Sequence, residues 1–101
     1  MINVVCTSKP GDGLLRYSYE HCAHLNSIGI KSQLIIITHY RFKDEHYINA
    51  IKEQYKTPHE PLVFNVYNPK SDEITLVMGR SMITLPYKDK KMYSYDQLLT
   101  L

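Results

Sequence analysis

The stretch INVVCTSKPGDGLL, residues 2–15, decides the fold of this chain. Residues 2–6 are apolar and rich in β-branched side chains, which is typical of a short strand. Residues 7–13 contain a proline and two glycines, which predict a turn, and a helical pattern begins at Leu14. A strand that passes through such a turn into a helix directs backbone N–H groups and the positive end of the helix dipole at one point. The sequence therefore predicts an anion site at this turn.

The glycines of this turn match a known phosphate-binding pattern only in part. Gly11 and Gly13 fit the first two positions of Gly-x-Gly-x-x-Gly, but Arg16 stands where the third glycine belongs. A plain connection between strand and helix is therefore the alternative. Arg16 is unfavourable in the first turn of a helix, which indicates an anionic ligand or an acidic neighbour. Asp12 offers a simpler compensation, because its charge lies near the same helix end.

The next part of the chain continues an alternation of strand and helix. The first helix is expected to end near Gly29, which suits a left-handed cap. Residues 33–38 form an apolar run that is typical of a central strand covered on both faces. A second amphipathic helix is predicted from Asp44, ending before Pro58. This β-α-β-α order predicts a Rossmann-like parallel sheet whose functional loops lie at the carboxyl edge of the strands.

The second half of the chain is predicted to add strands at residues 62–67 and Ile74–Met78. Two interpretations of Gly79-Arg80 remain open. In the first, which the local signals favour, a two-residue type II′ turn pairs Ile74–Met78 with residues 81–85, so that Ser81 lies opposite the last residue of the earlier strand. The domain then closes with a β-hairpin or meander. In the second, Ile74–Met78 is a further parallel strand and the Gly-Arg pair begins a functional loop at its carboxyl end.

The C-terminal segment predicts a short helix. Residues 1–92 are expected to form a single α/β domain, and residues 93–101 a short docking segment. Ser94 followed by Gln97 fits a capping box, so a helix is expected to begin at Tyr95. Such a short leucine-rich helix either packs back on the domain or docks on another chain, and docking is favoured because the leucines are otherwise exposed. The expected partner-binding residues are Tyr95, Leu98, Leu99 and Leu101.

The composition describes an ordinary globular domain. Of 101 residues, 44% are hydrophobic and 22% charged, and the net charge of +2 is too small to indicate nucleic-acid or membrane binding by itself. No stretch approaches the ~18 apolar residues of a membrane span. Cys6 and Cys22 occupy apolar positions, which indicates reduced thiols in a cytoplasmic protein. His21 and His24 lie three residues apart, close enough to share a metal, but no carboxylate completes an obvious ligand set, so no metal site is predicted.

The predicted ligand-binding residues belong to the loops at the carboxyl edge. His39 and Arg41 directly follow the central strand, where a general base or a phosphate contact can reach a ligand. No catalytic residue can be assigned, because the spacing yields no Ser-His-Asp set, no Cys-His pair and no Walker lysine. The predicted ligand- or phosphate-binding set is Gly11, Asp12, Gly13, Arg16, His39, Arg41 and Arg80.

Residues 2–38 resemble the opening of a GT-B glycosyltransferase. The resemblance is carried by the first strand, the Gly11-Asp12-Gly13 loop, the helix from Leu14 and the strand that follows. It implies that the loop approaches an acceptor or a sugar-nucleotide from an N-terminal Rossmann-like lobe, with Gly11, Asp12, Gly13 and Arg16 in that role. Within the family, the pattern is similar to that of phage enzymes that glycosylate modified DNA bases.

The size of the chain limits what this resemblance implies. In that family a C-terminal lobe holds most of the sugar-nucleotide, and a chain of 101 residues has no room for it. The resemblance thus implies an accessory subunit that gives acceptor or phosphate contacts to a larger partner chain and is not active alone. The expected partner is a second protein chain or another copy of this chain. No cofactor is expected on the isolated chain, while a sugar-nucleotide is expected in a complex, through which alone nucleic acid would be reached. The alternative is a non-enzymatic binding or inhibitor module that acts through its β-meander and its nine tyrosines.

Overall fold

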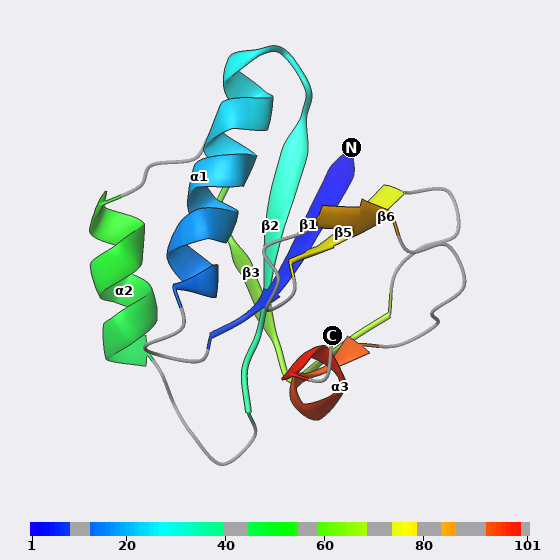
Figure 1. Cartoon of the computed structure of the whole chain (residues 1–101). Helices are drawn as coiled ribbons and strands as arrows, with labels where there is room; N and C mark the ends of the chain where they lie inside the picture. The colour runs from blue at the N-terminus through cyan, green and yellow to red at the C-terminus, as the bar shows by residue number, and fades with distance from the viewer. Residues whose placement is uncertain are drawn as a thin grey trace.

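The computed structural model describes residues 1–8, 13–39, 45–54, 59–68, 74–78, 84–86 and 93–99. Within them the chain forms a mixed α/β fold, in which two helices cover one face of a largely parallel sheet and a short helix lies on the other (Figure 1). The elements are β1 (Ile2–Thr7), α1 (Leu14–Ser27), β2 (Ser32–Ile37), α2 (Glu45–Gln54), β3 (Leu62–Phe64), β4 (Val66–Tyr67), β5 (Ile74–Met78), β6 (Thr84–Pro86), β7 (Tyr93–Ser94) and α3 (Tyr95–Leu99).

Several residues of the predicted sites fall outside this description. They are Gly11, Asp12, Arg41, Arg80, Leu101 and the side chain of Leu99. The predicted residues that the structure does describe are Gly13, Arg16, His39, Tyr95 and Leu98.

The main sheet has five strands in the order β3-β2-β1-β5-β6. Strand β1 is central and pairs in parallel with β2 on one side and β5 on the other, so that Val4 lies between Leu34 and Leu76. Strand β3 continues the parallel arrangement beyond β2. From β1 the chain continues to β2 on one side of it, whereas β5, later in the sequence, pairs with β1 on the other side. Four parallel strands therefore end at one carboxyl edge.

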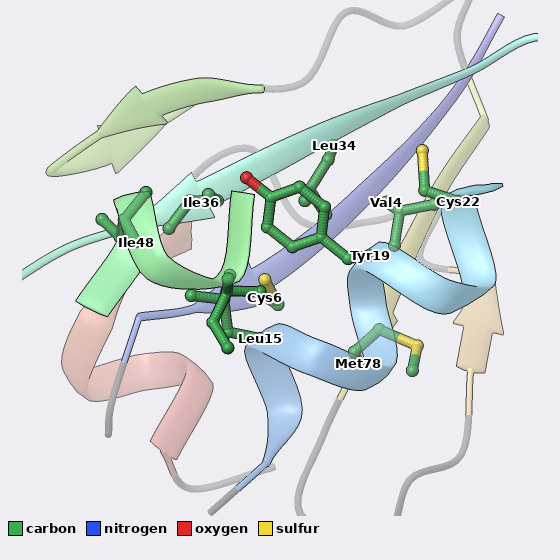
Figure 2. Packing of buried hydrophobic residues seen from close by; sticks show 10 residues of the cluster. Val4, Cys6, Leu15, Tyr19, Cys22, Leu34, Ile36, Ile48 and Met78 are labelled. Carbon is green, nitrogen blue, oxygen red and sulfur yellow. The ribbon is translucent and has the colours of Figure 1, made fainter. Parts of the chain in front are cut away.

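Alternating side chains of the strands divide the core into two clusters. The helix-side cluster lies between the sheet and the helices α1 and α2, and Figure 2 shows Tyr19 of α1 among the strand residues in its centre. Its buried members are Val4, Cys6, Leu15, Tyr19, Cys22, Leu34, Ile36, Ile48, Ile51 and Met78. The tail-side cluster lies on the opposite face and consists of Val5, Ile35, Ile37, Val77 and Leu98, with Tyr67 and Tyr95 packed against it.

Both glycines that flank α1 have positive φ, and the left-handed cap predicted at Gly29 is confirmed. Gly13 is the N-cap with φ 76°, and Gly29 follows the helix with φ 86°. At the C-terminal end the amide of Ile30 donates to the carbonyl of Leu25 over 2.9 Å. Positive φ is strained for any residue with a Cβ, so both positions favour glycine.

The expected strand over residues 62–67 is divided in two, which the sequence analysis did not anticipate. Asn65 interrupts it: β3 belongs to the main sheet, whereas β4 pairs antiparallel with β7 in a separate two-stranded sheet. The Asn65 amide nitrogen donates to both the carbonyl and the hydroxyl oxygen of Thr38, each over 3.1 Å. This side chain fixes the break by binding the exit of β2.

Both interpretations of Ile74–Met78 hold in part. The strand β5 is parallel to β1 and also antiparallel to β6, so it is at once a sheet strand and the first arm of a hairpin. The predicted register is wrong, however, because Met78 lies opposite Thr84 and not opposite Ser81. The connection is therefore longer than a two-residue turn. A three-stranded meander is absent from the described part of the chain, since β3 joins the far edge of the sheet.

The expectation that Leu98 docks on another chain is also corrected. Helix α3 begins at Tyr95 as predicted, but Leu98 is 2% exposed in the tail-side cluster. The sheet offers an apolar face that no long helix covers among the described elements, and Leu98 fills it. Of the two alternatives for this segment, Leu98 follows the one in which the helix packs back on the domain.

Candidate functional site

The candidate site lies at the carboxyl edge of the parallel strands. Strand β1 ends at Thr7, β2 is followed by Thr38 and His39, and α1 begins at this edge after Gly13. In open sheets of parallel strands, ligands bind at this edge, beside a strand whose connections leave in opposite directions. Strand β1 is such a strand, because its neighbours are β2 on one side and β5 on the other.

The N-terminus of α1 carries the positive end of the helix dipole, and its N-cap residue supplies no side-chain cap. Its N-cap residue Gly13 has no side chain, and the first turn contains no acidic residue. The Gly13 carbonyl accepts the first helical hydrogen bond from the amide of Tyr17 over 3.1 Å. Arg16 is exposed on the same turn. Both the helix dipole and the arginine therefore favour an anion at this end.

Thr7 places a buried hydroxyl at the end of the central strand. The residue is 1% exposed, and its Oγ1 has no hydrogen-bond partner in the described structure. The register puts Thr7 beside Ile37, on the face of the tail-side cluster. The next residue, Ser8, is also buried, and its amide donates to the carbonyl of Ile37 over 3.2 Å. An unpaired buried hydroxyl is costly, and Thr7 shares this property with Thr75 near the amino end of β5. Thr7 differs in lying at the carboxyl edge of the sheet.

His39 and Tyr95 are in contact beyond the end of β2. Their rings meet edge to face, with centroids 5.3 Å apart and an interplanar angle of 80°. His39 is half-buried directly after β2, where the sequence analysis placed a ligand contact. Tyr95 was predicted to bind a partner chain, but it lies against His39 and the tail-side cluster. The helix α3 thus brings a residue from far along the chain to the predicted edge.

Parts of this edge depend on contacts between residues that are distant in the sequence, and these were not predicted. Asn65 binds Thr38 next to His39, and the amide of Thr38 donates to the carbonyl of Phe64 over 2.9 Å. The turn at Asn65 gives a weak local signal, because asparagine is common in turns. The sequence around Asn65 does not identify Thr38, which follows β2, as its hydrogen-bond partner.

The other titratable groups of α1 belong to its packing. Burial, and then the nearby His24, lower the pKa of His21, whose buried Nε2 has no hydrogen-bond partner in the described structure.

The residues that the structure describes contain no group of three or more possible metal ligands. Among the described helices, none is long and apolar enough to cross a membrane.

Comparison with known proteins adds no relative. No family model, curated protein or solved structure matches the chain. Function is therefore inferred from the geometry of the carboxyl edge.

Proposed function

We propose that this chain binds a phosphate-bearing small molecule, such as a nucleotide or a sugar phosphate, at the carboxyl edge of β1 and β2. The observation that carries the proposal is the junction at the end of β1, where the Thr7 hydroxyl, which has no hydrogen-bond partner in the described structure, lies at the same edge of the sheet as the N-terminus of α1 with its glycine N-cap. The helix end attracts the phosphate through its N–H groups and its dipole. His39 contributes a second contact from the neighbouring strand end.

In this proposal the chain binds the ligand as part of a larger protein complex. The chain acts as an accessory subunit like the N-terminal lobe of a GT-B glycosyltransferase, giving acceptor or phosphate contacts to a partner chain that holds a sugar-nucleotide. The order of the parallel strands, β3-β2-β1-β5, supports a Rossmann-like lobe of this kind. One feature differs from a doubly wound sheet: the tail-side face carries the short α3 in place of long helices, within the described residues.

The ligand is tested with a matched pair of threonine variants. Thr7 and Thr75 both carry buried hydroxyls without a hydrogen-bond partner, on the same face of the sheet. Thr75 lies near the amino end of β5, away from the candidate site. We expect both Thr7→Val and Thr75→Val to retain or raise stability, since each removes an unpaired hydroxyl. Only Thr7→Val should weaken the binding of UDP-glucose or inorganic phosphate, followed by NMR shifts of backbone amides.

The helix end is tested with a matched pair of glycine variants. Gly13 and Gly29 flank α1 with similar positive φ angles, so alanine strains both. A Cβ at Gly13 would also lie 3.4 Å from Cε2 of Tyr17, whereas nothing lies within 4 Å at Gly29. Gly13→Ala should weaken phosphate binding by about tenfold or more, and Gly29→Ala should leave it unchanged. Equal affinity in the two variants, or no phosphate binding by the unmodified chain, contradicts the site.

The role in a larger assembly needs a separate measurement. The native mass of the complex purified from its own cells, with mass spectrometry of each chain in it, distinguishes the cases. A larger companion with a nucleotide-binding lobe supports the accessory subunit and leads to sugar-nucleotide assays. A chain that purifies without any other protein contradicts the subunit role but leaves the phosphate site to be judged by the variants above.

A further inference from the structure

The end of the described chain covers the tail-side face of the sheet. Residues 93–99, which we call the α3 segment, comprise β7 and α3. The helix packs on β1, and its Leu98 is 2% exposed against a cluster that includes Val5 and Ile37. Figure 1 shows α3 on the side of the sheet opposite α1 and α2, toward the carboxyl ends of the strands.

The hydroxyl of Thr7 lies on the face that this segment covers. Thr7 follows Val5 by two residues along β1 and is beside Ile37 of β2 in the register. Both of these neighbours belong to the cluster of Leu98. Thr7 itself is 1% exposed, and its Oγ1 has no hydrogen-bond partner in the described structure. A ligand at the carboxyl edge therefore reaches this hydroxyl only when the cover of the tail-side face moves.

The α3 segment also lies against His39. The ring of Tyr95 meets that of His39 edge to face, with centroids 5.3 Å apart. His39 directly follows β2, and Thr7 ends β1, so the two residues of the proposed site stand at adjacent strand ends. Movement of one short segment would therefore change the surroundings of both.

The cover of the tail-side face is much slighter than that of the opposite face. The helices α1 and α2 have 14 and 10 residues, whereas β7 has two and α3 has five. A helix of five residues is not stable without tertiary contacts. Segments that bury few side chains open at a lower free energy than the whole fold. The tail-side face should therefore be uncovered more often than the helix-side face.

We propose that the α3 segment is a lid on the phosphate site, which leaves the tail-side face to admit the ligand and closes again over the bound molecule. This lid rests on the proposed function, because it describes the regulation of the same site. In the open state Leu98 and Tyr95 withdraw, so that the hydroxyl of Thr7 and the ring of His39 become accessible. In the closed state Leu98 returns and excludes water, which strengthens a hydrogen bond between Thr7 and the ligand. A bound ligand therefore favours the closed lid.

Two adjacent residues of β2 provide a matched test. Ile36 and Ile37 are both 0% exposed, but the first faces the helix-side cluster and the second the tail-side cluster. Labelling of Ile36→Cys and Ile37→Cys by iodoacetamide, followed by mass spectrometry, reports how often each face is uncovered. The thiol at position 37 should react about tenfold faster or more, because opening of the lid exposes only its face. Cys6 and Cys22, buried in the helix-side cluster, are internal references and should react as slowly as the thiol at position 36. Equal rates at positions 36 and 37 overturn the lid.

Inorganic phosphate connects the lid to the site. At about ten times its Kd, phosphate should slow the labelling at position 37 about tenfold, because the ligand stabilises the closed state. Phosphate that shifts backbone amide signals but leaves this labelling rate unchanged overturns the lid and not the site. A chain that binds no phosphate overturns the site, and the opening of the segment is then judged by positions 36 and 37 alone.

A second matched pair keeps the test decisive if Ile37→Cys does not fold. Leu34 and Ile35 are each 1% exposed and face the helix-side and the tail-side cluster, respectively. The thiol of Ile35→Cys should again react faster than that of Leu34→Cys. Adding Leu98→Ala should raise the labelling rate at the tail-side position more than at the helix-side position. An equal rise at both positions assigns the labelling to global unfolding and overturns the lid.

Discussion

The side chain of Asn26 joins the end of α1 to the start of β2. Its amide nitrogen donates to the carbonyl of Cys22 over 2.9 Å, and to the hydroxyl and carbonyl oxygens of Ser32 over 3.0 and 3.2 Å. Its oxygen accepts from the amide of Ser32 over 3.2 Å. The hydroxyl of Ser32 in turn donates to the carbonyl of Cys22 over 3.1 Å. One amide thus fixes the turn between the first helix and the second strand.

Removing the side-chain amide of Asn26 should lower the stability of the fold. Asn26→Ala leaves the partly buried groups of Ser32 and Cys22 without partners, so we expect the free energy of unfolding to fall by about 2–3 kcal/mol. Ser27→Ala is the control, because its exposed hydroxyl makes a single bond to the carbonyl of His24. That variant should lose less than about 1 kcal/mol in urea denaturation. Similar losses in the two variants would show that the Asn26 network is not a special constraint.

Tyr19 makes the stability of the fold sensitive to alkali. Burial first, and then the nearby thiols of Cys6 and Cys22, raise the pKa of Tyr19 from 10.0 to about 12. Between these values the unfolded chain releases a proton that the folded chain keeps, so the free energy of unfolding falls as pH rises through this window. The contribution is fully present below about pH 10 and amounts to at most about 3 kcal/mol.

The check is a series of urea denaturations at increasing pH. Tyr19→Phe should remove most of the decline between pH 10 and 12. Burial also raises the pKa of the Cys22 thiol, which adds a decline in the same direction that remains in the variant. An unchanged pH profile in Tyr19→Phe would assign the decline to other groups.

At the scale of single residues, the sequence predicts positions better than contacts. Gly13 and His39 lie at the carboxyl edge, as their places after predicted strands required. The hydroxyl of Thr7 was not singled out, since its lack of a hydrogen-bond partner depends on neighbours from β2 and the tail-side cluster. The sequence close to Thr7 does not indicate which distant residues pack around it.

At the scale of elements, Leu98 and Tyr95 are the described side chains by which α3 packs on the sheet. Leu98 is buried against Val5, Ile35, Ile37 and Val77, and α3 also carries Tyr95 to His39. We expect Leu98→Ala to lower the free energy of unfolding by about 2–4 kcal/mol, because it leaves a cavity in the tail-side cluster. Leu62→Ala, at a residue that is 44% exposed, should cost much less in the same urea titration.

The same variant links the helix to the candidate site. If α3 positions Tyr95 beside His39, Leu98→Ala should also weaken phosphate binding under conditions where the chain remains folded. Leu98→Met keeps most of the apolar volume and should restore both properties. Unchanged binding in Leu98→Ala would separate α3 from the site.

The elements that the sequence predicts well are those with a complete local pattern. Helix α1 has a stripe of apolar residues and a glycine at each end, and β2 has an uninterrupted apolar run. The break at Asn65 and the register of Met78 were missed for one reason. Both depend on a strand that is distant in sequence, β2 for the first and β6 for the second, and a turn type alone does not determine such pairing.

At the scale of the whole molecule, the parallel sheet follows from the alternation of strands and helices, whereas its second face does not. The two predicted helices of ordinary length account for the covering of one face of the sheet, and no element was predicted to cover the other face. The short α3 covers part of it, and β4 and β7 pair as a separate small sheet. A segment of five residues is too short to be assigned to a face by periodicity.

The sheet order also predicts how local stability varies across the molecule. Strand β1 is paired on both sides and its residues 3–7 are buried, so its amides should exchange with deuterium at the slowest rate. The amides of β3, which within the described part of the chain pairs on one side only, should exchange faster. Equal exchange rates in β1 and β3 would contradict this gradient.

The position of Leu98 has a consequence for synthesis on the ribosome. The helix-side cluster draws most of its members from residues 4–51, so this half of the core can assemble while later residues are still being added. The tail-side cluster waits for Val77 and then for Leu98. A nascent chain therefore passes through a stage in which Val5, Ile35 and Ile37 face the surroundings, and at that stage it is most in need of a chaperone.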